Sequence, residues 1–144
     1  MNFGLIGIGA ALAFAAIGSA LGSGAAGMAA VGAWKKCFAQ NKPAPFMLVA
    51  FVGAPLTQTI YGFILMNTLR RAVENMIDPG LLLGAGVLGG IAMGFSAWLQ
   101  GRAGACAADA LAETGKGFGN YIMVLGLIET VALFVMVFLM GAMG

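Results

Sequence analysis

The chain has 144 residues, of which 61% are hydrophobic and only 8% are charged, with a mean hydropathy of +0.99 and a net charge of +2. These values lie outside the range of ordinary soluble domains and indicate a membrane protein with no room for an additional soluble domain. The few scattered basic residues argue against a nucleic-acid-binding surface, and two distant cysteines without any histidine indicate neither a zinc site nor a disulfide framework.

Four long apolar segments follow one another along the chain, and each is predicted to be a helix. The expected helices cover about residues 2–37, 45–71, 79–114 and 120–143. Each exceeds the roughly 20 residues that a helix needs to cross about 30 Å of hydrocarbon, so all four are expected to span the membrane. The first starts without a basic segment and outlasts the apolar region of a signal peptide, so we interpret it as a retained span. The predicted fold class is therefore an all-α membrane protein.

Short polar segments rich in proline or glycine separate these helices: AQNKPAP, ENMIDPG and TGKGFGN. Basic residues are concentrated at or near the first and third of these loops, and fewer lie at the second. The first group is Lys35, Lys36, Lys42, Arg102 and Lys116, and the second is Arg70 and Arg71. By the positive-inside rule, the first and third loops are expected in the cytoplasm and both termini outside the cell membrane.

The second half of the chain repeats the first. One alignment matches small residues of the first predicted helix with small residues of the third, and the pairs include Gly7 and Gly84, Ser19 and Ser96, and Gly24 and Gly101. Aligning the second and fourth helices places Gln58 over Glu129. We therefore divide the chain into two tandem helical hairpins, residues 1–72 and 73–144, of which only the second carries a membrane acid.

Glycine and alanine are concentrated in the first and third predicted helices, whereas the second and fourth are richer in large apolar residues. Small residues let helix backbones approach closely in lipid. This asymmetry favours a ring in which the small-residue helices form the inner circle. Generic close packing in a lone four-helix bundle is the alternative.

Glu129 is the only carboxylate inside any of the four apolar stretches. An ionised carboxylate in hydrocarbon is costly even after water defects form around it, so such a residue is by default a candidate for function. We expect Glu129 to hold a proton or a cation, or to pair with a buried group.

Polar groups are predicted to converge on Glu129 near the middle of the membrane. Pro55 removes a backbone donor from the second helix, and the residues that share one face around it are Ala54, Thr57, Gln58 and Tyr61. Gln100 lies about 14 residues before the end of the third helix, and Glu129 lies about 10 residues after the start of the fourth. The two are therefore expected at depths within about a turn of each other. A hard cation needs several oxygen ligands whereas a proton needs fewer, so this set favours Na⁺ over H⁺. Interhelical hydrogen bonding without an ion is the simpler alternative.

Three short motifs resemble those of a known family. They are PLTQTIYGF at residues 55–63, the pair Gln100 and Gly101 in SAWLQGRAGA, and the pair Glu129 and Thr130 in LIETVA. They are similar to the proteolipid, or K, subunit of V-type and A-type rotary ATPases, a duplicated relative of the F-type ring proteolipid, and the resemblance covers essentially all 144 residues. It implies a homo-oligomeric membrane ring whose rotation, driven by ATP hydrolysis in a peripheral head, carries ions past a stator. The chain itself is expected not to be an enzyme, since it has no nucleotide-binding motif.

The resemblance also implies a role for each candidate residue. Glu129 is expected to be the essential ion-binding carboxylate, and the Tyr61 hydroxyl to steady it. The expected ligands of Na⁺ are Thr57, Gln58, Gln100 and the backbone carbonyl of Ala54. Ala54 is smaller than the residue expected there, a change that a backbone ligand tolerates. The implied partners are membrane lipid, a stator subunit with an essential arginine, and central-stalk subunits on the cytoplasmic side.

Other functions stay open at this point. An H⁺-translocating ring of the same family would use the same acid. A small four-helix multidrug antiporter would need an aromatic pocket around Glu129, and such antiporters lack a duplicated hairpin with glycine-lined helices. A pore-forming or structural proteolipid would need no cation ligands. Of these functions, the rotor ring is the one that the sequence favours.

Overall fold

The structure is a computed structural model that describes residues 3–143, and within them it is all-helical. The helices are α1 (Gly4–Ala39), α2 (Leu48–Gly53), the 3₁₀ turn η1 (Ala54–Leu56), α3 (Thr57–Glu74), α4 (Pro79–Thr114) and α5 (Phe118–Gly141). Because α2, η1 and α3 form one continuous span, the described residues hold 4 helices that are long and apolar enough to cross a membrane. This confirms the predicted fold class.

The observed helix boundaries differ slightly from the predicted ones. The second span begins at Leu48 rather than residue 45 and ends at Glu74 rather than residue 71, and α5 begins at Phe118 rather than residue 120. The predicted start of the first helix, Asn2, lies outside the described residues. Pro43 and Pro45 disfavour helical backbone at the residues before them, Lys42 and Ala44, so the second span cannot begin before Pro45.

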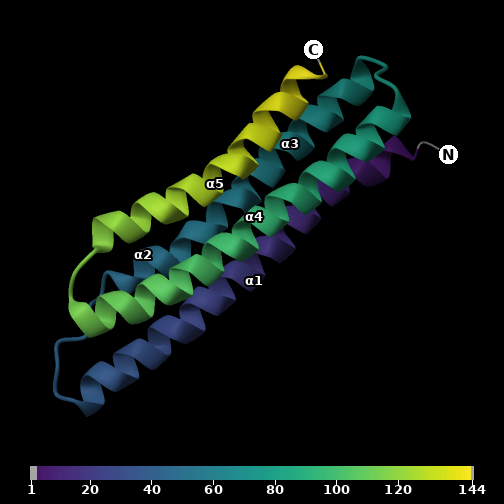
Figure 1. The fold of residues 1–144 in the computed structure, drawn as a ribbon. Helices are drawn as coiled ribbons and strands as arrows, with labels where there is room; N and C mark the ends of the chain where they lie inside the picture. The colour runs from purple at the N-terminus through teal and green to yellow at the C-terminus, as the bar shows by residue number, and fades with distance from the viewer. Residues whose placement is uncertain (1–2, 144) are drawn as a thin grey trace.

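The four spans run alongside one another (Figure 1). The loops α1–α2 and α4–α5 lie at one end of the molecule, while both termini and the α3–α4 loop lie at the other (Figure 1). This places the first and third loops together, as the sequence predicts. Which end faces the cytoplasm stays a prediction.

Local signals in the sequence account for the loops. Asp78 caps α4, because its Oδ1 accepts hydrogen bonds from the backbone N–H groups of Gly80 at 2.9 Å and Leu81 at 3.0 Å. The α4–α5 loop uses two residues with left-handed backbone, Gly115 at φ 65° and Gly117 at φ 90°, which glycine adopts without a steric penalty. These two features fix where the second hairpin turns.

Helices α1 and α4 pack with their backbones in contact. A Cβ atom added to Gly18 would collide with the backbone of Gly94, and one added to Gly101 would collide with the backbone of Gly22. In lipid, close packing of this kind replaces the hydrophobic driving force that holds soluble helices together. The glycine-rich helices therefore form the tightest seam of the molecule.

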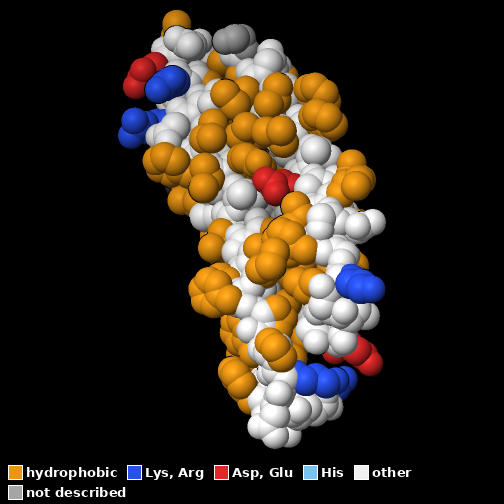
Figure 2. All heavy atoms as spheres, turned by 90° about the vertical axis from the view of Figure 1, so that its left-hand side faces the viewer, with side chains coloured by type: hydrophobic (Ala, Val, Ile, Leu, Met, Phe, Trp, Pro, Cys, Tyr) orange, Lys and Arg blue, Asp and Glu red, His pale blue; other side chains and the backbone are white. Residues whose placement is uncertain are grey.

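Helix α5 lies on the outside of this seam and is largely exposed. Its buried residues are Leu125, Ala132 and Met136. Figure 2 shows a face on which hydrophobic side chains cover most of the surface and most charged side chains lie toward the ends. An acidic side chain stands among the hydrophobic ones in the middle of this face (Figure 2). Such a surface suits contact with lipid tails or with other apolar helices.

Candidate functional site

Pro55 breaks the second span at the level of the site. The chain tightens there into the 3₁₀ turn over Ala54–Leu56, which separates α2 from α3. Proline explains the break, since it lacks a backbone donor and its ring crowds the preceding turn. The hydroxyl of Thr57 donates to the carbonyl of Ala54 at 3.0 Å, so two oxygen atoms lie side by side at the start of α3.

Two fully buried glutamines connect α3 to α4. Gln58 and Gln100 are both 0% exposed. The Nε2 of Gln58 donates to the Oε1 of Gln100 at 2.8 Å, and the Oε1 of Gln58 lies 3.1 Å from the hydroxyl of Thr57. Buried amides are costly unless they are hydrogen-bonded, and these two satisfy each other.

Glu129 lies on α5 and receives one hydrogen bond on each carboxylate oxygen. The hydroxyl of Tyr61 donates to Oε1 at 2.7 Å, and the Nε2 of Gln100 donates to Oε2 at 3.0 Å. Gln100 also donates to the carbonyl of Leu125 at 3.0 Å, which fixes its amide against α5. The carboxylate is therefore held from two helices while its side chain remains only partly buried.

All six residues singled out in the sequence thus belong to one connected network across η1, α3, α4 and α5. The chain of contacts runs through Ala54, Thr57, Gln58, Gln100, Glu129 and Tyr61. Helical spacing and matched depth predicted this convergence. The roles of these residues as cation ligands stay a prediction.

Ser96 belongs to the same network but was not recognised from the sequence as a site residue. Its hydroxyl donates to the carbonyl of Ile128 at 2.9 Å and accepts a hydrogen bond from the Nε2 of Gln58 at 3.4 Å. Ser96 therefore ties α4 to both α3 and α5. Its position one helical turn before Gln100 was the available signal, because residues four apart share a face.

The donor atoms of the network are those that a hard cation prefers. Carboxylate, amide, hydroxyl and carbonyl oxygens suit cations that bind oxygen, whereas zinc prefers thiolate and imidazole. Within residues 3–143, no group of three or more Cys, Asp or Glu side chains could hold a metal ion. One carboxylate and several neutral oxygens carry a single negative charge, which one monovalent cation would neutralise.

Comparisons with known proteins show which family the chain is similar to. The model of the ATP synthase C-subunit family matches residues 83–140, which cover most of α4 and α5. The chain is also 33% identical over 132 residues to the A-type ATP synthase subunit K of Methanocaldococcus jannaschii. That match covers 91% of this chain but only 57% of the relative, so the chain spans little more than half of the relative's length.

Proposed function

We propose that the chain is a multi-pass membrane proteolipid of the ATP synthase C-subunit family and that it serves as a rotor-ring subunit of a V/A-type rotary ATPase. In this role it is not itself an enzyme. Glu129 binds Na⁺ near the middle of the membrane and carries it past a stator as the ring turns. The observation that carries this proposal is the oxygen-rich network built around a single membrane carboxylate.

The spacing of the oxygen atoms supports a cation. The Ala54 carbonyl and the Gln58 Oε1 lie 3.0 and 3.1 Å from the Thr57 hydroxyl. A hard cation that holds oxygens at about 2.3–2.6 Å places neighbouring ligands roughly 3–3.5 Å apart. A proton on Glu129 would need none of these three atoms, so Na⁺ is the ion that we propose.

The duplicated glycines support a ring. Gly7, Gly86 and Gly101 pack against the backbone of the facing helix in the α1–α4 seam, whereas a Cβ at the matched position in the other hairpin would meet nothing within 4 Å. The open partners are Gly84, Gly9 and Gly24, respectively. Each hairpin therefore uses one glycine face inside the chain and leaves the equivalent face of the other hairpin free.

Free faces of this kind suit a head-to-tail contact between copies. The open glycines of α1 match the packed glycines of α4. Helix α1 can therefore pack against the α4 helix of a second copy with the same glycine face that α4 uses against α1 within the chain. A heterologous contact repeated around an axis closes into a ring when the rotation allows it. The partner at the free glycine faces is therefore another copy of this chain.

Charge neutralisation gives the mechanism. With Na⁺ bound, Glu129 carries no net charge and crosses the lipid at low cost as the ring turns. At the stator, an arginine from a different protein of the assembly competes for the carboxylate, and the ion leaves through an aqueous path. Tyr61 and Gln100 each hold one carboxylate oxygen and keep it oriented while the ion is exchanged. Central-stalk subunits meet the end that carries the α1–α2 and α4–α5 loops.

The site count has an energetic consequence. Because Gln58 stands where the second hairpin has Glu129, one ion is carried for every two hairpins. Compared with a ring of the same size that has one acid per hairpin, fewer ions cross per turn. The same energy per turn then works against a steeper ion gradient.

Carbodiimide labelling of the assembled ring tests this proposal, because the reagent reacts with a protonated membrane carboxyl. We expect labelling at Glu129 that Na⁺ suppresses and K⁺ does not, at a pH where labelling is otherwise efficient. Glu129→Gln removes the labelled group and serves as the control. Labelling that depends on pH alone would overturn the Na⁺ assignment in favour of H⁺, and labelling elsewhere with Glu129 unreactive would overturn the site itself.

A further inference from the structure

Arg102 is an arginine at an unexpected depth. It follows Gln100, the partner of Glu129, by two residues, which is about 3 Å along the helix axis. Two residues also correspond to about 200° around a helix, so Arg102 leaves α4 on the side away from α5. Within residues 3–143, the one ion pair joins Lys36 to Glu113, and no carboxylate pairs with Arg102. A guanidinium near the level of the membrane acid therefore has no anionic partner in the described part of the chain.

Trp98 holds this guanidinium one helical turn earlier on the same face. The Arg102 guanidinium carbon lies 5.7 Å from the centroid of the Trp98 ring, and the Phe95 ring lies 5.9 Å from that of Trp98. A cation stacked over an aromatic ring keeps its N–H groups free for an anion. The indole N–H of Trp98 likewise makes no hydrogen bond in the described part of the chain. The pair is a set of donors without an acceptor.

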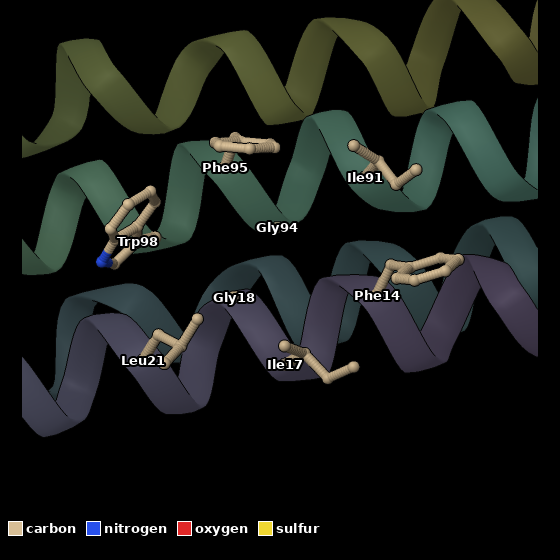
Figure 3. Close-up of a pocket in the computed structure, with 8 residues that line it drawn as sticks. All are labelled: Phe14, Ile17, Gly18, Leu21, Ile91, Gly94, Phe95 and Trp98. Carbon is tan, nitrogen blue, oxygen red and sulfur yellow. The ribbon is translucent and has the colours of Figure 1, made fainter.

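An apolar groove of about 240 Å³ leads away from Trp98 between α1 and α4. Figure 3 shows its floor at Gly18 and Gly94, where the two helices come closest, and its large side chains on either side. The walls include Phe14 and Leu21 on α1 and Phe95 and Trp98 on α4. The groove has hydrocarbon along its length and a cation at one end, which is the complement of an amphiphile with an anionic head.

The lengths of the uncharged stretches of α4 and α5 also favour an amphiphile with an anionic head group. From Pro79 to Gly101, α4 carries no charged residue, and these 23 residues span about 35 Å, roughly one bilayer core. Arg102 is therefore the first charged residue of α4, after a stretch about one bilayer core long. On α5, in contrast, Glu129 lies in the middle of a helix that is otherwise uncharged. The first cation of α4 thus lies near the depth of the ion site, where a lipid phosphate would be drawn to it.

We propose that Arg102 and Trp98 bind the phosphate of a glycerophospholipid whose acyl chain lies in the groove over Gly18 and Gly94. The guanidinium and the indole N–H donate to the phosphate oxygens, and the chain runs toward the end of the molecule that carries the termini. An extended peptide would leave backbone polar groups unpaired in this apolar groove. The free glycines that we assign to a second copy, Gly9, Gly24 and Gly84, are not among the residues that line the groove, so the groove is left for lipid.

Native mass spectrometry of the assembled protein, purified in mild detergent, tests the site. We expect wild-type protein to retain phospholipid in proportion to the number of chains, and Arg102→Gln to lose most of it. Arg70→Gln is the matched control, because Arg70 is also an exposed arginine but lies outside the groove, near the end of α3. Equal retention by wild type and Arg102→Gln would overturn the proposal.

A second measurement does not depend on a variant of Arg102. The chain has 2 tryptophans, so Trp34→Phe leaves Trp98 as the only indole. In vesicles of phospholipid brominated at different depths, we expect Trp98 fluorescence to be quenched most by bromine near the carbonyl end of the acyl chain. Strongest quenching by bromine at the chain terminus would place ordinary bilayer centre at Trp98 and overturn the proposal. Neither measurement requires Na⁺ transport, so its outcome is separate from that of the ion site.

Discussion

The two hairpins carry the same scaffold but different polar chemistry at matched positions. In the second hairpin, Ser96 and Gln100 both form side-chain hydrogen bonds within the site. The same alignment places them opposite Ser19 and Ser23, whose hydroxyls are buried and have no hydrogen-bond partner within residues 3–143. A glutamine side chain extends two atoms further than a serine side chain. Gln100 can therefore reach Glu129 on the neighbouring helix, and a serine at the matched position is too short for an equivalent contact.

Gln58 shows how the two halves cooperate in one site. It occupies the position that corresponds to Glu129, yet its amide contacts Ser96 and Gln100 of the other hairpin. The first hairpin has therefore become a source of neutral ligands for the second. The two hairpins together therefore form one site, in which the second supplies the only acid.

The largest expected effect is the loss of stability on replacing Gly101, whose matched residue in the first hairpin is Gly24. A Cβ at Gly101 would collide with the backbone of Gly22, which cannot move aside as a flexible side chain can, so Gly101→Ala is expected to open the α1–α4 seam. Overpacking costs about 1–3 kcal/mol where side chains adjust, and a backbone collision belongs at the upper end or beyond. Circular dichroism during heating in detergent should show a clearly lowered melting temperature.

Gly24→Ala is the matched variant and separates folding from assembly. A Cβ there meets nothing within 4 Å, and alanine favours a helix over glycine by about 0.5–1 kcal/mol, so the helix content should not fall. If the head-to-tail contact is right, the added methyl instead meets a neighbouring copy. Native gel electrophoresis should then show loss of the ring. An intact ring in Gly24→Ala would contradict the proposed interface.

A smaller effect, on Na⁺ affinity, is expected from Gln100→Ala. Ser23→Ala is its counterpart in the first hairpin. Removing the Gln100 amide leaves one Glu129 oxygen without its donor and takes away an acceptor of the buried Gln58 amide. An unsatisfied buried group costs about 1–3 kcal/mol, so Na⁺ affinity should fall roughly 5- to 150-fold. Ser23→Ala removes a hydroxyl that has no partner in the described residues and should leave affinity unchanged.

Sodium titration of carbodiimide labelling measures both variants on the assembled ring. The comparison fails if the two substitutions shift the titration equally, because the effect would then reflect general loosening of the helices. It also fails if Gln100→Ala leaves the midpoint in place, since Gln100 would then have no part in holding the carboxylate.

Most of the fold followed from the sequence because its signals are local. Apolar length set the four spans, and the Asp78 cap and the glycines after Thr114 fixed where α4 begins and ends. Pro55 predicted a missing backbone donor, but not that the chain would tighten into a 3₁₀ turn over Ala54–Leu56. That response depends on how the second span packs against α1 and α4, which no local pattern encodes.

The residues that converge at the site could also be predicted, whereas the pattern of hydrogen bonds between them could not. Spacing and depth brought Gln58, Gln100 and Glu129 together, because helix geometry fixes which residues share a face. Which amide donates to which oxygen depends on the register of α3 and α5 against α4, a property of the packed molecule. Ser96 was overlooked for this reason, since its role appears only once the Ile128 carbonyl is placed opposite its hydroxyl.

The smallest expected difference lies between Ser96→Ala and Ser19→Ala, and it tests the comparison of the hairpins most closely. Ser96→Ala removes a donor to the Ile128 carbonyl and an acceptor for Gln58, so we expect a loss of about 1 kcal/mol in stability. Ser19 is 2% exposed and its hydroxyl has no partner in the described chain, so Ser19→Ala should be neutral or slightly stabilising. Thermal unfolding of the two variants side by side measures the difference. Equal destabilisation would mean that Ser19 finds a partner in the assembled ring, and the two hairpins would then be more alike in polar contacts than the single chain indicates.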